Sequence, residues 1–193
     1  MKRRLAMALV PVFLLLSCGG TGETAAATCR EQYWDGSVGV CVPGGWSIVD
    51  RETLADRGVP DEVVVAFQAA KAASGQFPTV TITKETLTEE LDSKTYSSAS
   101  IKSVGTLPGY TLVDTKDLTV DGSQVGLHVF TAQPLNDEPA RRFYQVSAVS
   151  GGAGYTVTGL APVSVVESLD SEIELILSSL SFKAPAGSTS SKE

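Results

Sequence analysis

Residues 110–149 decide the fold of this chain, and they read YTLVDTKDLTV over 110–120, QVGLHVFT over 124–131 and RFYQVSAV over 142–149. All three segments are rich in β-branched and aromatic residues, which favour extended backbone. In the middle segment Val125, Leu127 and Val129 occupy alternate positions and therefore share one face of a strand. We predict consecutive strands here, joined by hairpin connections.

The segments that follow carry a strand signal and then a helix signal. Gly151 to Gly154 predicts a turn, and residues 155–160 predict a further strand. A helix is expected next, with Ser164 and Glu167 as a capping box. Its apolar residues recur at helical spacing: Val166, Leu169, Ile173, Ile176 and Leu177. Residues 180–182 are expected to close the domain as a last strand.

The segments before residue 110 carry both signals as well. Residues 46–49 and 79–83 predict strands. A helix is expected over 60–74, because Pro60 lies near its start, acidic residues follow and Gly75 stands at its end. A second helix is expected over 89–103. Together these elements predict an α+β domain with an antiparallel β-sheet flanked by helices, an α/β/α sandwich.

The N-terminus has the features of a bacterial export signal. Lys2, Arg3 and Arg4 precede an uninterrupted apolar run over 5–16, which is shorter than the roughly 20 residues that a membrane-spanning helix needs. Leu15-Leu16-Ser17-Cys18 resembles the bacterial lipobox, in which the cysteine is acylated and the chain is cleaved before it. We expect a signal peptide over 1–17 and a lipid anchor at Cys18. The alternative is ordinary secretion, with Cys18 present by chance.

Composition divides the rest of the chain. The small and polar stretch 18–28 is expected to be a flexible tether from Cys18, and 184–193 a disordered tail, which leaves 42–183 as one α+β domain. Without the three basic residues of the signal, 12 basic and 22 acidic side chains give a formal net charge of −10. This charge repels nucleic acid and anionic lipid head groups, so the anchor has to hold the protein at the membrane.

Two cysteines remain if Cys18 carries lipid. Cys29 and Cys41 are expected to form a disulfide in the oxidising envelope, closing 29–41 as a loop or small hairpin. The alternative is a redox or metal-binding pair, which the absence of C-x-x-C spacing and of nearby histidines disfavours. Within this segment Tyr33 and Trp34 are a candidate contact surface for a ligand or partner. Their alternative is to fold back and cover the edge of the sandwich.

Candidate catalytic chemistry is sparse. The single histidine, His128, lies in a predicted strand, on the face opposite Val125, Leu127 and Val129. A hydrolase acting on envelope lipid or glycan would need a nucleophile near it, and the candidates are Ser147, Thr156 and Thr158. The chain contains neither the G-x-S-x-G nucleophile elbow nor the H-E-x-x-H zinc motif. We therefore expect no enzyme activity, no metal site and no cofactor, and we interpret His128 as a packed or hydrogen-bonded residue of the sheet.

Several short motifs resemble the PsbP-like fold, which is shared by bacterial envelope lipoproteins, a photosystem subunit and a Ran-binding import factor. The resemblance covers about 42–183 and rests on Val42-Pro43-Gly44-Gly45-Trp46, Pro108-Gly109-Tyr110, Gly126-Leu127-His128-Val129-Phe130, Tyr155-Thr156-Val157-Thr158 and Leu180-Ser181-Phe182. The mycobacterial LpqN-type lipoproteins look most similar in function. The resemblance implies a non-enzymatic module that binds an envelope protein or small ligand. Apart from the resemblance, a structural spacer that needs no ligand is a further alternative. No binding residue is carried over from the family.

Overall fold

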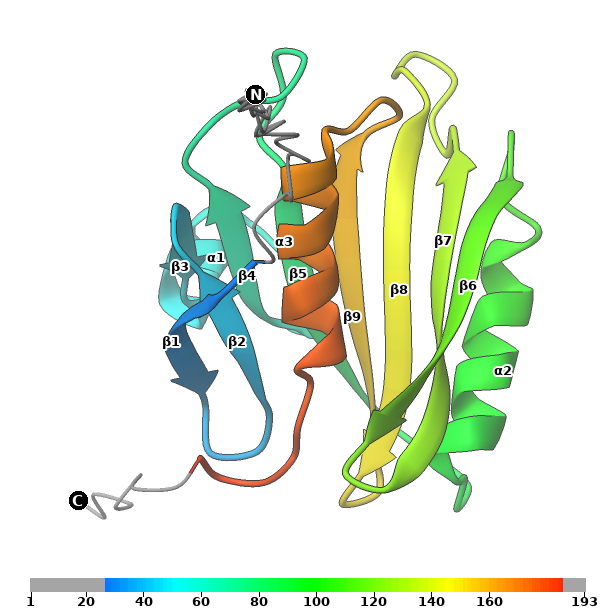
Figure 1. The fold of residues 1–193 in the computed structure, drawn as a ribbon. Helices are drawn as coiled ribbons and strands as arrows, with labels where there is room; N and C mark the ends of the chain where they lie inside the picture. Colours follow the sequence, from blue (N-terminus) through cyan, green and yellow to red (C-terminus); the bar gives the residue numbers. More distant parts are fainter. Residues whose placement is uncertain (1–26, 186–193) are drawn as a thin grey trace, which may run out of the picture.

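The computed structural model of the protein describes residues 27–185 (Figure 1). The predicted signal peptide, Cys18, most of the predicted tether and most of the predicted tail lie outside the described residues.

A seven-stranded sheet forms the centre of the fold (Figure 1). Every neighbouring pair in it is antiparallel. The strands lie in the order β3 (Trp46–Val49), β4 (Val63–Ala69), β5 (Thr79–Thr86), β9 (Ala153–Pro162), β8 (Arg141–Ser150), β7 (Ser123–Ala132) and β6 (Thr111–Val120). The predicted hairpins of 110–160 are confirmed, with tight turns at Asp121-Gly122 and Gly151-Gly152.

Two twelve-residue helices cover opposite faces of the sheet (Figure 1). Helix α2 (Ser93–Val104) packs on β7 and β8, and α3 (Glu167–Ser178) packs over β8 and β9 from the other side. The predicted α/β/α sandwich is therefore confirmed.

Helix α3 approaches the sheet closely because β9 has no side chain at Gly159. A Cβ atom there would lie 2.6 Å from Ile173 Cγ2, closer than side chains pack. Ile173 is fully buried, as is Tyr144, whose ring also borders Gly159. The Tyr144 hydroxyl donates a hydrogen bond of 2.5 Å to Asp170 of α3, and burial raises the pKa of this hydroxyl far above its usual range. The contact therefore combines apolar packing with a partly buried hydrogen bond.

Helix α2 meets the sheet through serines and through the buried ring of Tyr96, which packs over Gly154 of β9. The Ser93 hydroxyl accepts a hydrogen bond from the Val149 amide, and the Ser97 hydroxyl accepts one from the Gly126 amide. The Ser100 hydroxyl contacts polar side chains of β8. Serines at these spacings share one helix face, which explains how a helix with so few apolar residues is held against the sheet.

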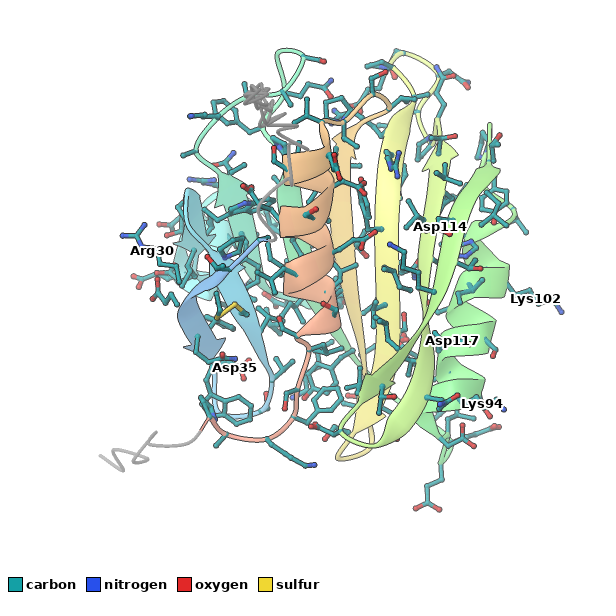
Figure 2. All side chains as sticks on the ribbon, viewed as in Figure 1. Arg30, Asp35, Lys94, Lys102, Asp114 and Asp117 are labelled. Atoms are coloured by element: carbon teal, nitrogen blue, oxygen red, sulfur yellow. A yellow bond between two sulfur atoms is a disulfide. The ribbon has the colours of Figure 1, made fainter. Side chains whose placement is uncertain are left out.

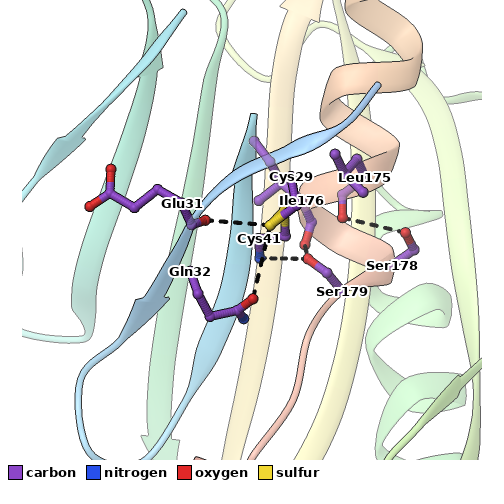
Figure 3. The surroundings of a disulfide bond; sticks show 8 residues. All are labelled: Cys29, Glu31, Gln32, Cys41, Leu175, Ile176, Ser178 and Ser179. Carbon is purple, nitrogen blue, oxygen red and sulfur yellow. Dashed lines mark hydrogen bonds between the residues drawn. A yellow bond between two sulfur atoms is a disulfide. The ribbon is translucent and has the colours of Figure 1, made fainter. Parts of the chain in front are cut away.

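A separate hairpin, β1 (Cys29–Trp34) and β2 (Gly39–Pro43), packs beside α3. The disulfide expected between Cys29 and Cys41 is present, and it closes the hairpin (Figure 3). The Cys41 amide donates a hydrogen bond of 2.7 Å to the hydroxyl of Ser179, directly after α3. The hairpin is thus attached to the end of α3 as well as closed by its disulfide.

The helix predicted over 60–74 is wrong. Residues Val63–Ala69 form β4, which pairs with β3 on one side and with β5 on the other. Valines at 63, 64 and 65 favour extended backbone, and the β-ladders on both sides outweigh the helix signals around Pro60. The short helix α1 (Arg51–Asp56) lies just upstream and was not predicted; Asp50 caps it by accepting a hydrogen bond from the Thr53 amide.

Two predicted details at the C-terminal side also need correction. Helix α3 begins at Glu167 after Val166, without a side-chain cap, so Ser164 and Glu167 do not form the predicted capping box. Residues 180–182 do not form a full strand. Ser181 makes a single bridge to Gly39, and the Asp121 carboxylate accepts hydrogen bonds from Ser181 and Phe182.

Strand β6 forms one edge of the sheet and exposes charged side chains. Asp114 and Asp117 project from it (Figure 2), and the Lys116 ammonium lies 2.6 Å from a carboxylate oxygen of Glu174 on α3. Charges on an edge strand oppose pairing with a strand of another molecule.

We predict that Gly159→Ala destabilises the domain by about 1–3 kcal/mol, because the added methyl group has to displace Ile173 or Tyr144 in a packed core. Urea denaturation followed by circular dichroism measures the change. Gly44→Ala is the matched control, since the nearest atom to its new methyl group is 3.8 Å away. Equal midpoints for the two variants would contradict the close packing of α3.

Candidate binding cavity

One hollow of about 510 Å³ lies at the end of the sheet where α3 begins. Three segments distant in sequence surround it: the β2–β3 turn at Gly44-Gly45, the β4–β5 connection and the start of α3. Its walls consist mainly of small and apolar side chains, including Ala69, Ala70, Ala72, Ala73, Val166 and Leu169. Ligand sites in proteins commonly have volumes of about 300–1,000 Å³ and predominantly apolar walls, so this cavity has the size and lining of a small-molecule site.

Two hydrogen bonds hold the walls in place. The Trp46 indole donates to a carboxylate oxygen of Glu172 at 2.8 Å, which joins β3 to α3. The Ala70 amide donates to the Gly45 carbonyl at 2.7 Å, which joins the β4–β5 connection to the β2–β3 turn. Trp46 itself is buried. These bonds fix the walls relative to one another without filling the space between them.

The charged side chains of the cavity are Lys71 and Glu172. Glu172 already accepts the indole hydrogen bond, whereas Lys71 is exposed. The arrangement offers an apolar surface with one ammonium group beside it, and hydroxyls of Ser74, Ser164 and Ser168 at its border. It can bind a ligand with an apolar body and a polar or anionic end. None of the residues that line this site was predicted from the sequence as a binding residue, because they are mostly small residues without a motif.

Tyr33 and Trp34, the predicted contact residues, are both half-buried on the β1–β2 hairpin. Tyr33 packs edge-on against Phe67 of the sheet, with ring centroids 5.3 Å apart, and burial raises the pKa of its hydroxyl to about 12. Trp34 packs over Gly39, where a Cβ atom would lie 2.9 Å from the indole. The structure thus places both against neighbouring residues, and their use as a contact surface stays a prediction.

His128 lies inside the α2 face of the sheet and is 3% exposed. Its Nε2 atom is 2.7 Å from the Tyr110 hydroxyl, and its Nδ1 atom is buried without a hydrogen-bond partner among the described residues. The rings of Tyr110 and Phe130 lie beside it. Burial lowers the pKa of the imidazole, so His128 is neutral at pH 7.

The candidate nucleophiles form contacts elsewhere. The Ser147 hydroxyl is 2.9 Å from those of Ser100 and Thr156, and Ser147 is buried under α2. Thr158 pairs with Gln145 and Thr81 in the sheet. Among the described residues, the hydroxyl hydrogen-bonded to His128 belongs to Tyr110. The structure therefore does not bring His128 together with any of the three predicted nucleophiles.

In residues 27–185 no group of three or more His, Cys, Asp or Glu side chains is arranged to hold a metal ion. Over the same residues none of the helices has the length and apolar content of a membrane span.

Comparison with known proteins gives a fold but no family. No family model matches the chain, and no curated protein has a significant sequence match. Among solved structures, LpqN of Mycobacterium tuberculosis, described as involved in cell envelope biogenesis, aligns with a TM-score of 0.54 at 15% identity over 75% of this chain and 82% of its own.

Two further structures have the same fold. The cyanobacterial PsbP protein of Synechocystis aligns with a TM-score of 0.53 at 17% identity, over 85% of this chain and 96% of its own. The Ran-binding protein Mog1p of Saccharomyces cerevisiae aligns with a TM-score of 0.53 at 8% identity, over 81% and 96%. The predicted resemblance to the PsbP-like fold is confirmed.

We predict that the domain loses stability as the pH falls below about 6.5 and that His128→Gln removes the loss that begins there. The unfolded chain binds a proton on the imidazole near pH 6.5, whereas the folded state resists it until a lower pH because the ring is buried. Above pH 6.5 both states are neutral, and the effect disappears. Urea titrations at several pH values measure it, and the chain has one histidine. An unchanged pH profile in His128→Gln would refute a buried neutral imidazole.

Proposed function

We propose that this chain is a lipid-anchored, non-enzymatic binding protein on the extracytoplasmic side of the bacterial cell envelope. The anchor is Cys18, and the ligand site is the cavity between Gly44-Gly45, the β4–β5 connection and α3. The observation that carries the proposal is this preformed cavity, with its apolar walls and its single ammonium group at Lys71. Its ligand is a small molecule of the envelope with an apolar body and a polar or anionic end.

Three observations support the location. Leu15-Leu16-Ser17-Cys18 resembles the bacterial lipobox, whose cysteine is acylated. The disulfide between Cys29 and Cys41 suits an oxidising compartment outside the cytoplasm. LpqN, which has the same fold, is described as involved in cell envelope biogenesis. The acidic balance of the chain argues against nucleic acid as a partner.

The surroundings of His128 support a role without catalysis. A general base has to reach both a nucleophile and a substrate, but this imidazole is almost completely buried and contacts Tyr110, Phe130 and β8. These contacts of His128 therefore do not support the hydrolase alternative. The remaining alternatives, a protein partner or a spacer without a ligand, are outcomes of the second experiment below.

The anchor predicts that cells expressing the full chain incorporate an alkyne-labelled fatty acid into it, and that Cys18→Ser abolishes the label. Click detection after immunoprecipitation measures the incorporation. Cys41→Ser is the matched control, since it removes a thiol that the structure places in a disulfide, and we expect full labelling in it. Equal labelling of the wild type and Cys18→Ser would exclude Cys18 as the acylated residue.

If the cavity is the ligand site, single-chain anionic amphiphiles should raise the melting temperature of the domain. We expect Ala72→Phe to increase at least tenfold the amphiphile concentration that gives half of the maximal shift. Ala72 lines the cavity and is exposed, so the phenyl ring occupies ligand space without entering the core. Ala55→Phe on α1 is the matched control and is expected to respond as the wild type does. A ligand at about 100 times its Kd adds roughly 2.7 kcal/mol of stability.

Three results would count against the cavity as the ligand site. An equal response of the two variants would place the site elsewhere. No response to any amphiphile, glycan or peptidoglycan fragment would favour a protein partner or the spacer. Turnover of an envelope lipid or glycan that His128→Gln abolishes would favour the hydrolase.

A further inference from the structure

We propose that the end of the sheet at which the cavity opens is a membrane-docking surface, which lies against the phospholipid bilayer that holds the anchor. This inference rests on the lipid anchor of the proposed function and adds an orientation and a second membrane contact to it. We define this end, the cavity end, by five connections: 44–45, 70–78, 105–110, 133–140 and 163–166.

The first observation is where the exposed apolar side chains lie. Six large apolar side chains are strongly exposed in residues 27–185, and all of them lie in these connections or at the adjoining start of β6: Phe77, Leu112, Val113, Leu135, Val163 and Val166. Val166 is 67% exposed and Leu135 55%. The strand register brings these segments together, because Thr79 pairs with Leu160, Arg141 with Pro162 and with Ala132, and Thr111 with Thr131. The connections 70–78, 133–140 and 163–166 lie at the top of Figure 1.

Scattered exposed apolar residues are ordinary, but here they share one end of the molecule. Apolar side chains from several loops can enter the boundary between lipid head groups and acyl chains, where burial of each contributes free energy. Phe77 and Val166 lie in segments that also form the cavity wall. Docking would therefore open the cavity toward the bilayer, from which an amphiphilic ligand can enter.

The second observation is the distribution of charge. The connections of the cavity end contain Lys71, Asp137 and Glu138 and are close to neutral. The connections at the opposite end, 35–38, 50–62, 87–92, 121–122 and 151–152, contain ten acidic residues and two basic ones, Arg51 and Arg57. Asp35 is labelled at the lower side of Figure 2. Lys183, which follows α3, pairs with Asp121 at 3.7 Å.

This asymmetry fits a bilayer with anionic head groups. Such a surface repels the acidic end within about one Debye length, roughly 8–10 Å. It has far less effect on the cavity end, where acidic and basic residues are almost balanced. Electrostatic repulsion and apolar attraction therefore favour the same orientation.

The third observation is where the described chain begins. Cys29 pairs with Pro43, directly before the Gly44-Gly45 turn of the cavity end. The ten residues between Cys18 and Cys29 can span at most about 35–40 Å. A ten-residue strand of this sheet is itself about 34 Å long. The tether is therefore long enough for an anchor at Cys18 to let the cavity end reach the bilayer.

The test uses the lipidated chain in vesicles of phosphatidylcholine and phosphatidylglycerol, with or without brominated acyl chains as a fluorescence quencher. Leu135→Trp places a probe at the cavity end, and Thr88→Trp places the matched probe in an exposed position of the opposite end. The wild-type signal of Trp34 and Trp46 is subtracted. We expect brominated lipid to remove at least half of the Leu135→Trp emission, and less than a tenth of the Thr88→Trp emission.

A further variant separates docking from chance proximity. Adding Phe77→Asp and Val166→Asp to Leu135→Trp should reduce the quenching at least threefold, and both positions are exposed, so the fold is expected to persist. Equal quenching of the two probes, or no effect of the aspartates, would overturn the docking surface. A blue shift of Leu135→Trp that depends on protein concentration and needs no vesicles would assign the surface to a second copy of the chain and overturn it too.

Flotation of the vesicles reports on the anchor separately. If the wild-type chain does not float with the vesicles, the proposed lipid anchor at Cys18 is refuted. The two probes are then compared with vesicles added in excess to the unanchored chain. Preferential quenching of Leu135→Trp under those conditions would still support docking, and equal quenching would refute it.

Discussion

The close contact between α3 and the sheet at Gly159 is the constraint on which the rest of this structure depends. Because β9 has no side chain there, Ile173 reaches the sheet beside Tyr144 and is fully buried. The partly buried hydrogen bond from Tyr144 to Asp170 adds direction to this apolar contact, since it fixes how far along the strand the helix lies. Arg142 lies 3.2 Å from the same carboxylate and balances its charge.

The position of α3 in turn sets the position of its neighbours. The β1–β2 hairpin is held to the C-terminal end of the helix through Ser179 and through the bridge between Gly39 and Ser181. At the other end Glu172 accepts the Trp46 hydrogen bond, and Leu169 and Val166 form a wall of the cavity. One helix therefore supports the disulfide-closed hairpin at one end and the candidate ligand site at the other. The opposite face of the sheet is covered by α2, which is held by hydrogen bonds of its serines and by the buried ring of Tyr96, and this face also buries His128.

The proposed function draws on this division between the two faces and the two ends. The α2 face contains the chain's single imidazole, yet the ring is buried and its hydroxyl partner is Tyr110. The α3 face ends in a cavity with apolar walls and a lysine. A lipid-anchored binding module uses the second feature and needs nothing from the first. The PsbP-like fold shared with LpqN, cyanobacterial PsbP and Mog1p is compatible with several roles, so the argument for binding rests on the cavity.

Much of the secondary structure of this protein, together with its disulfide, could be predicted from patterns of neighbouring residues in the sequence. Alternation of apolar residues predicted the strands of 110–160, the cysteine pair predicted the disulfide, and the apolar spacing of 166–177 predicted α3. Each signal depends on residues close together in the chain. Tertiary structure decided the rest. Residues 63–69 became a strand because β3 and β5 pair with them, against the helix signals around Pro60.

The residues of the cavity and the exposed apolar residues of the cavity end could not be predicted, because they come from connections up to about 120 residues apart, and none of these connections contains a motif. The same holds for His128, whose burial and contacts depend on α2 and on Tyr110. A periodic pattern fixes which face of an element is apolar, but only the packing of distant segments decides what that face meets.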